Sequence, residues 1–436
     1  MDPKPKFYGW YLLAVLFALD FVNMGFPYYG GTVINGYMIH QIPMSRSVLG
    51  LGFTFVNLAV GLSAVLVAAH IVKFGVRATF IVGSSLICFG SLFLAIFCTK
   101  PWHYLFAFGI VNGIGISFST IVTSATTVTR WFRRFRGRGI GIALSGSGFS
   151  GFAVSWFLDK MLRTAGGNWR AGWYIVAAAA ALAALVALLF VRESPESLGQ
   201  FPDGISGAAL AIPTRTDRLA TTHPWTAEQA FRTPTFWLIA FAGITSTYPS
   251  FFFVAHAILH MRAANISSAD AAFAMGVFTI ATLVGRWLGG LLMDTINARL
   301  AYALGLALTI VGCYYMLILR GDALTPAYLA AALYGGSHGW TFSCTGTMTG
   351  HYWGPKAFPK VYGTMMLFIS GGASPAGVIG GRLFDAYGDY TRAILLNGIL
   401  AAIGIAAILF ATMPTPRDSA DTKPESVPQS LRASNA

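Results

Sequence analysis

Long apolar segments separated by short polar stretches run along most of this chain. Twelve of them are long enough to cross a bilayer as helices, because about 20 residues span the hydrocarbon core. The segments lie at about 8–33, 46–70, 78–98, 103–128, 139–161 and 171–191, and then at about 235–260, 269–293, 299–319, 324–350, 361–383 and 391–413. The pattern predicts an all-α membrane protein with twelve transmembrane helices in two six-helix bundles.

The longest polar stretch inside the chain divides these segments into two sets of six. We therefore predict four parts: an N-terminal bundle at residues 1–192, a linker loop at 193–234, a C-terminal bundle at 235–413 and a polar tail at 414–436.

The two sets of six segments also resemble each other in sequence. Three pairs of identical residues are each separated by 222 positions, namely Arg77 and Arg299, Trp131 and Trp353, and Gly141 and Gly363. A repeated six-helix unit is typical of transporters that bind substrate near the membrane midplane, between two rocking halves.

Composition agrees with the hydropathy pattern. The chain is 55% hydrophobic and only 10% charged, whereas soluble domains carry about 25% charged residues. The four cysteines fall in apolar segments without paired spacing, so we expect neither a disulfide framework nor a metal site. The sequence has no phosphate-binding P-loop and no Gly-x-Ser-x-Gly nucleophile turn, so it supports neither ATP-driven transport nor hydrolysis. We expect no enzyme activity and no cofactor.

Basic residues are unevenly distributed among the loops. Nineteen lysines and arginines lie in the termini and the even-numbered loops, and eight lie in the odd-numbered loops. By the positive-inside rule, this predicts an integral protein of the cell (inner) membrane with both termini in the cytoplasm. The basic cluster from Arg130 to Arg138 is then a topology anchor beside the lipid bilayer. We expect no nucleic-acid partner.

One arginine lies deep inside an apolar segment. Arg286 is about 12 Å of helix rise from Asp294 and about 20 Å from Phe273. A guanidinium there costs several kcal/mol and cannot lose its proton. It therefore needs a negative partner, either a structural aspartate or the anion of a substrate. We expect the substrate anion.

Several other polar residues are candidates for chemistry. Asp20, in the middle of the first segment, is a candidate proton carrier or resting partner of Arg286, and a structural hydrogen bond explains it equally well. His256 is a second candidate proton carrier, and His338, between glycines, is a candidate substrate contact. His256 and His260 have i, i+4 spacing, but no third ligand joins them, so we expect no metal.

The first and fourth segments supply the remaining candidate substrate contacts. Tyr28 and Tyr29, with Asn23 and Asn35, predict a polar wall opposite Arg286, and Tyr28 and Asn23 are our candidate substrate contacts there. Ser119 belongs to a segment rich in small and hydroxylated residues. Such residues serve either tight helix packing or hydrogen bonding to a carboxylate.

Two loops carry a recognisable spacing. Gly290, Asp294 and Arg299 resemble the signature G-x-x-x-D-(R/K)-x-G-x-(R/K) of the major facilitator superfamily, although Thr295 and Asn297 depart from it. The first-half copy keeps three residues of the signature but has Val72 where the acid belongs; the three are Lys73, Gly75 and Arg77. We expect both loops to act as conformational motifs.

Four further stretches resemble the monocarboxylate transporters and the oxalate/formate antiporters within that superfamily. They are Tyr8-Gly9-Trp10, Arg130-Trp131-Phe132, the segment 195–204 and the segment 380–385. The resemblance implies proton-linked or exchange transport of small carboxylates, with an arginine of the eighth helix on the carboxylate. Arg286 occupies that position.

The chain departs from those relatives at three positions. The aspartate one turn earlier in the animal transporters is Thr282 here, and their first-helix lysine falls at Tyr28. The second cation of the antiporters is missing from the segment 367–375. A single intramembrane cation favours a monoanion over a dianion.

We predict a secondary active transporter of small monocarboxylates or related organic anions, working by alternating access and proton symport. The alternatives are anion exchange and export of larger amphipathic compounds.

Overall fold

The computed structural model describes residues 7–38, 41–42, 46–205, 221, 223–321 and 323–415. The first half contains α1 Tyr8–Met24, the π-helix η1 Gly25–Tyr29, α2 Gly30–Met38, α3 Arg46–Phe97, α4 Pro101–Tyr104, the π-helix η2 Leu105–Asn112, α5 Gly113–Ser119, α6 Ile121–Trp131, α7 Arg136–Ala143, α8 Gly146–Thr164 and α9 Trp169–Phe190. Two short 3₁₀ helices follow, η3 Pro195–Leu198 and η4 Pro202–Gly204. The second half contains α10 Ala227–Phe231, α11 Pro234–Ala263, α12 Ser268–Thr295, α13 Ala298–Leu317, α14 Thr325–Ala373, α15 Ala376–Tyr387 and α16 Thr391–Phe410.

The described residues are almost entirely helical, which confirms the predicted all-α membrane fold. Nine helical segments within the described ranges are long and apolar enough to cross a membrane. The longest helices, α3 and α14, each break at a glycine with positive φ, Gly75 at 84° and Gly354 at 70°. Only glycine adopts that backbone conformation freely. The breaks favour two crossings per helix, and the count of twelve stays a prediction.

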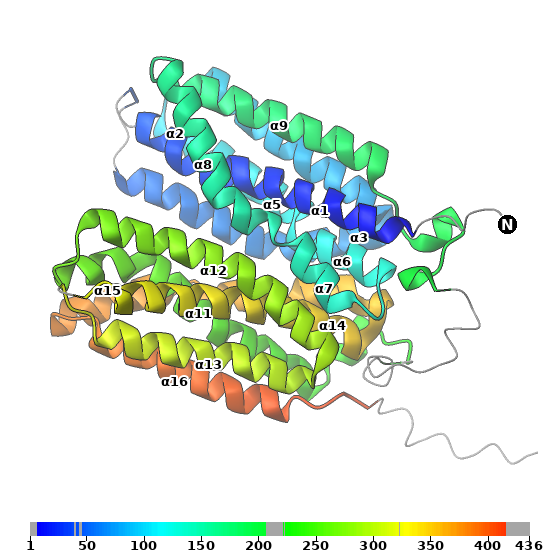
Figure 1. Ribbon diagram of the computed structural model, residues 1–436. Helices are drawn as coiled ribbons and strands as arrows, with labels where there is room; N and C mark the ends of the chain where they lie inside the picture. The colour runs from blue at the N-terminus through cyan, green and yellow to red at the C-terminus, as the bar shows by residue number, and fades with distance from the viewer. Residues whose placement is uncertain are drawn as a thin grey trace, which may run out of the picture.

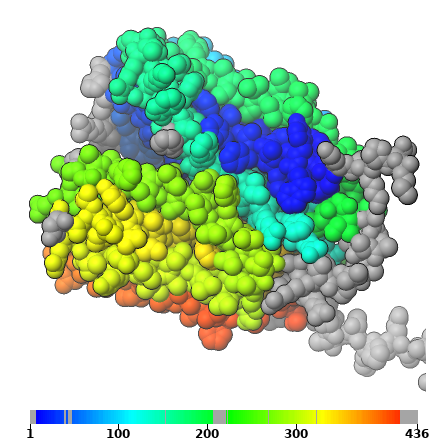
Figure 2. Space-filling model, viewed as in Figure 1, coloured from blue at the N-terminus to red at the C-terminus, as the bar shows by residue number. Residues whose placement is uncertain are grey.

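The two halves of the chain form two stacked layers (Figure 1). Helices α1 to α9 make one layer and α11 to α16 the other, and Figure 2 shows them meeting along a seam. The first and last described residues lie at the same end of the molecule, together with the segment after α9. At that end the backbone N–H of Tyr8 donates to the side chain of Gln200 at 3.0 Å. We call it the linker end.

Glycines bring the two layers into backbone contact near the linker end. A Cβ atom on Gly137 of α7 would collide with the carbonyl oxygen of Gly290 of α12. A Cβ on Gly363 of α14 would lie 2.7 Å from the carbonyl oxygen of Ala64 of α3. Close approach through small residues is the usual way in which membrane helices pack. The halves are therefore closed against each other at this end.

The second-half conformational motif lies at this closed interface. Asp294 accepts hydrogen bonds from the backbone N–H groups of Gly137 and Arg138, both at 2.9 Å. The carboxylate thereby caps the N-terminus of α7, where the helix dipole favours negative charge. Arg299 lies within the second half and donates to the carbonyl of Leu409 at 2.9 Å. Of this motif, Gly290 and Asp294 thus join the two halves.

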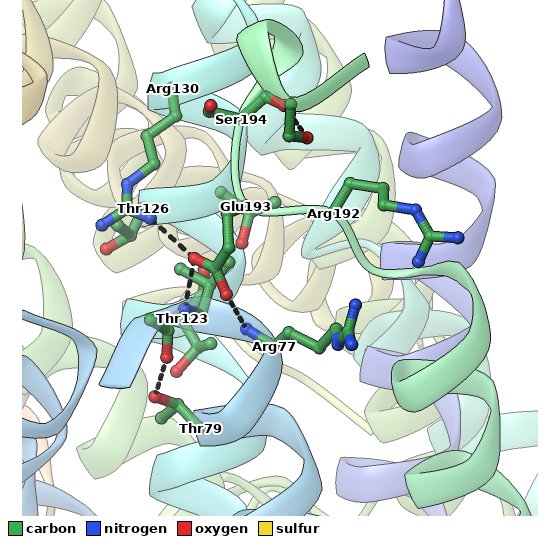
Figure 3. Close-up of polar contacts among 12 residues, drawn as sticks. Arg77, Thr79, Thr123, Thr126, Arg130, Arg192, Glu193 and Ser194 are labelled. Carbon is green, nitrogen blue, oxygen red and sulfur yellow. Dashed lines mark hydrogen bonds and ion pairs between the residues drawn. The ribbon is translucent and has the colours of Figure 1, made fainter. Parts of the chain in front are cut away.

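The first-half motif is held within its own half (Figure 3). The carboxylate of Glu193, just after α9, accepts hydrogen bonds from the backbone N–H groups of Val76 and Arg77, both at 2.9 Å. It also pairs with Arg130 at 3.0 Å. Gly75 is required here, because a Cβ atom would collide with this carboxylate. Glu193 therefore supplies the acid that the sequence motif lacks.

The neighbouring residue Lys73 has a different environment. Its ammonium group lies 5.0 Å from the centre of the Phe74 ring, which places it in a cation–π contact. Phe74 is itself exposed. Lys73 therefore lies at the periphery of the motif, and its predicted part in conformational change stays a prediction.

Candidate substrate-binding site

Arg286 lies on α12 where the two halves meet. Its Nη1 donates a hydrogen bond of 2.5 Å to the hydroxyl of Ser147 on α8. The backbone N–H of Ser147 in turn donates to a carboxylate oxygen of Asp20 on α1 at 2.6 Å. Within the described ranges, no direct ion pair joins the guanidinium to a carboxylate. Ser147 thus separates the buried carboxylate of Asp20 from the partly buried guanidinium of Arg286.

A break between α7 and α8 creates the helix N-terminus that Asp20 caps. α7 ends at Ala143 and α8 begins at Gly146, so the first N–H groups of α8 have no partner within their own helix. Gly146 lets α1 approach, because a Cβ atom there would collide with the carbonyl oxygen of Phe17. Asp20 is only 2% exposed and caps this helix start. The cap stabilises its negative charge inside the protein.

Two residues of α14 lie beside the guanidinium. The carbon at its centre is 5.4 Å from the centre of the Phe342 ring. His338, one helical turn before, lies 6.0 Å from the same ring centre to centre and interacts electrostatically with Arg286. Close packing of α12 on α14 fixes this arrangement, because Cβ atoms on Gly285 or Gly339 would collide with backbone carbonyls of the facing helix.

Unsatisfied hydrogen-bonding groups gather around Arg286. Its Nε is buried and has no hydrogen-bond partner among the described residues. The same is true of Nδ1 of His338 and of the hydroxyl of Tyr362. Tyr362 is fully buried and also interacts electrostatically with Arg286. Buried polar groups without partners are costly, so this cluster is suited to a polar ligand. A carboxylate would accept hydrogen bonds from several of them.

Of the two tyrosines in the predicted polar wall, the structure brings Tyr29 to the charged pair, and the role of Tyr28 in substrate binding stays a prediction. Tyr29 interacts electrostatically with both Arg286 and Asp20. The hydroxyl of Tyr28 instead accepts a hydrogen bond from Asn57 of α3 at 3.4 Å. Both tyrosines lie in the π-helix η1, whose wider turn rotates the residues that follow it.

Asn23 and Ser119 lie inside the first half. The Asn23 side chain accepts a hydrogen bond from Ser84 of α3 at 3.2 Å, and Ser119 donates to the carbonyl of Gly115 at 2.7 Å. Both side chains are 0% exposed. No contact in the described part of the chain joins either of them to Arg286. Their predicted part in substrate binding stays a prediction without a contact to support it.

His256 lies away from the charged pair, near the end of the second half that is opposite the linker end. Its Nε2 lies 2.8 Å from the carbonyl oxygen of Gly377, and its Nδ1 lies 3.2 Å from the hydroxyl of Tyr390. Because a carbonyl only accepts, Nε2 carries a hydrogen and Nδ1 can accept from the tyrosine. Both ring nitrogens of His256 therefore have partners within the second half. Its predicted part in proton coupling stays a prediction, and Asp20 is the better placed candidate.

The sequence analysis did not single out Phe342, Tyr362 or Ser147 as part of the site. Phe342 and Tyr362 are aromatic residues in apolar segments and carry no pattern that separates them from the core. Ser147 follows a glycine and a serine in a run of small residues. Only the break between α7 and α8 shows that its N–H and hydroxyl face the charged pair.

The fold and the site together define a class of protein. Two packed layers of apolar helices, with a partly buried cation where they meet, are the arrangement of a membrane transporter built from two halves. Comparison of the sequence with family profiles gives the family. The profile of the Major Facilitator Superfamily matches residues 10–264 and 250–434, so the chain belongs to this superfamily of transporters.

Individual relatives and solved structures agree with this assignment. Monocarboxylate transporter 13 of Bos taurus is 28% identical over 378 residues, which cover 82% of this chain and 78% of that protein. An MFS-type transporter of Gibberella moniliformis is 23% identical over 344 residues, or 78% of this chain and 76% of that protein. The solved structures share the fold at lower identity.

Two such structures are proton symporters for sugars. The proton:xylose symporter XylE has a TM-score of 0.71 at 13% identity, covering 94% of this chain and 97% of its own. The Escherichia coli fucose:proton symporter FucP has a TM-score of 0.65 at 16% identity, covering 94% and 100%. At such identities the likeness shows the fold alone.

Proposed function

We propose that this protein is a secondary active transporter of small monocarboxylates or related organic anions, driven by proton symport. The observation that carries the proposal is the hydrogen bond of Arg286 to the neutral hydroxyl of Ser147. A permanent, partly buried cation lies between the halves without a direct ion pair to any described acid. In this proposal, the linker end and both termini face the cytoplasm of the cell (inner) membrane.

A carboxylate substrate would complete the hydrogen bonding of Arg286. Guanidinium groups bind carboxylates through two parallel N–H donors, and the Nε of Arg286 is one donor without a described partner. The substrate would then displace Ser147 from Nη1. The bound negative charge offsets the cation, which lowers the cost of the occluded state, in which the site is closed off from water on both sides. An empty carrier would change conformation slowly, and a loaded carrier would change conformation faster.

Asp20 gives a route to proton coupling. When a substrate anion is bound, two carboxylates share one guanidinium, and one negative charge is left over. A proton on Asp20 removes that charge. The proton and the anion would therefore move together in equal numbers. His338, which also lies beside Arg286, is the second candidate for this proton.

The similar proteins support the substrate class and the coupling. The Bos taurus relative is named a monocarboxylate transporter, and both solved structures are titled proton symporters. Arg286 brings one positive charge to this site, which favours a monoanion over a dianion. Anion exchange uses the same binding chemistry, since a loaded carrier moves in both directions. A dependence on the pH gradient separates symport from exchange.

Uptake into proteoliposomes tests the proposal. Radiolabelled formate, lactate, pyruvate and an aromatic acid would be offered with and without a pH gradient. We expect accumulation of at least one acid that depends on the gradient, a strong loss with Arg286→Lys and no uptake with Arg286→Ala. Arg163→Ala is the control, because Arg163 has a side chain that is 74% exposed and, among the described residues, its ion pair is with Asp159 on its own helix. Full uptake by Arg286→Ala would contradict the proposal.

A further inference from the structure

A second buried arginine lies between the halves, at the linker end. Arg136 begins α7 and is only 3% exposed. Its Nε and Nη1 are buried and have no hydrogen-bond partner in the described part of the chain, and it forms no ion pair there. A buried guanidinium without partners is destabilising. The positive-inside rule requires only that the basic residues of this loop be exposed to water on the cytoplasmic side. It therefore does not explain why Arg136 is buried.

The acids near Arg136 are occupied by backbone groups. Asp203 and Asp294 interact electrostatically with it. Asp294 accepts from the N–H groups of Gly137 and Arg138, as described above. One oxygen of Asp203 accepts from the backbone N–H groups of Arg133 and Arg134 at 3.1 and 2.7 Å. Both acids therefore hold the loop and the start of α7, and neither lies within ion-pair distance of the Arg136 guanidinium.

A histidine from the other half faces this arginine. His351 of α14 is 1% exposed, and neither of its ring nitrogens has a hydrogen-bond partner among the described residues. It interacts electrostatically with Arg136. The preceding Gly350 makes room for the arginine, because a Cβ atom there would lie 2.8 Å from its Cδ and 3.2 Å from its Nη1. One half thus contributes the cation and the other half the imidazole.

We propose that Arg136 and His351 form a second anion site, which binds the carboxylate of the transported monoanion when the linker end opens. This inference rests on the function proposed above. Opening must separate α7 from α14 and expose both unsatisfied side chains to water. A carboxylate then accepts hydrogen bonds from the guanidinium and from a protonated ring nitrogen.

The position of Arg136 fits a site on the path to Arg286. Gly141 of α7 packs against the backbone of Arg286. Arg136 lies five residues earlier on the same helix, about 7.5 Å of rise toward the linker end. A cation at the mouth of a cavity raises the local concentration of anions and their rate of entry. The second site therefore acts on substrate that enters or leaves through the linker end.

Transport measured separately from each face tests this site. Uptake would be compared in right-side-out cells and inside-out vesicles, with a protease site at the C-terminus to report which face is exposed. We expect Arg136→Gln and His351→Gln to raise KM about tenfold at the linker face and less than twofold at the opposite face. Arg136→Lys should recover part of the loss. The control Arg163→Gln should leave both values unchanged.

Other outcomes separate the alternatives. Equal changes of KM at both faces, or no change at either face in well-inserted variants, would overturn the second site and leave the proposed function standing. If Arg136→Gln fails to insert into the membrane, the KM values of His351→Gln at the two faces provide the same test. Inhibition at the linker face by chloride as strong as by formate would make this an inorganic-anion site and overturn the carboxylate assignment. A wild-type protein that moves no carboxylate would instead refute the proposed function.

Discussion

Asp20 and Arg286 lie in opposite halves of the protein and are joined through a single residue, Ser147. The backbone N–H of Ser147 donates a hydrogen bond to the carboxylate of Asp20, and its hydroxyl accepts a hydrogen bond from the guanidinium of Arg286. The two charges therefore sense each other without the direct contact that would lock the halves together. A ligand that replaces the serine hydroxyl changes the charge balance of the whole interface.

The first prediction concerns proton coupling. Asp20→Asn keeps the size of the side chain and removes its charge, so it should abolish pH-driven accumulation and preserve exchange. We expect accumulation under a pH gradient to fall at least tenfold, while counterflow of labelled substrate stays within about threefold of wild type. Both assays would use the same proteoliposomes. Persistent pH-driven accumulation in this variant would transfer the coupling role to His338.

The second prediction concerns Ser147. Ser147→Ala removes a hydrogen bond to a charged group, which contributes about 1.5–3 kcal/mol. The empty protein should lose several degrees in Tm, and saturating substrate should stabilise the variant more than it stabilises wild type. Thermal unfolding in detergent, with and without a carboxylate, measures both effects. Ser155→Ala, on the same helix, is the control. An unchanged Tm in the empty variant would contradict the bridging role.

The third prediction concerns the closed linker end. Gly290→Ala would place a methyl group against the backbone of Gly137, so it should disfavour the closed state. Gly276 is the matched control on the same helix, because no atom lies within 4 Å of its would-be Cβ. We expect Gly290→Ala to increase the labelling rate of a cysteine placed at the linker end at least threefold, and Gly276→Ala to leave it unchanged. Equal labelling of both variants would show that the halves do not close through this contact.

The fourth prediction concerns the contact of Gly75 with Glu193. Gly75→Ala combines an unfavourable positive φ with a collision against the carboxylate. Gly354→Ala has the same backbone problem, at φ 70° and ψ 172°, but the new methyl group would make only an ordinary contact, 3.6 Å from Thr221. Backbone strain costs about 1–3 kcal/mol, and we expect Gly75→Ala to exceed the control by at least the value of one hydrogen bond to a charged group. The comparison of the two Tm values measures the collision alone.

The sequence predicted the class of fold and the central cation because both follow from the cost of polar groups in a membrane. Arg286 stands out as a charge far from any helix end. Asp20 stands out for the same reason, and the structure places it beside the arginine through Ser147. Glu193 did not stand out, since it lies at a helix end where acids are common.

Positions that depend on local irregularity escaped sequence reasoning. Tyr28 and Tyr29 were not distinguished, because the π-helix changes the face that each one presents. Asn23 satisfies part of its hydrogen bonding inside its own half, and no periodicity reveals that. Arg136 is buried by the way in which α14 packs on α7, so its sequence context, a basic loop, gives no indication of it.

Equilibrium binding of a radiolabelled monocarboxylate to the purified protein tests the central claim most directly, because it reports on Arg286 without the steps of transport. The account predicts saturable binding by wild type, binding at least tenfold weaker by Arg286→Lys, which keeps the charge but loses the paired donors, and none by Arg286→Ala. Arg163→Ala should bind like wild type. Unchanged affinity in the folded Arg286→Ala protein would contradict the account.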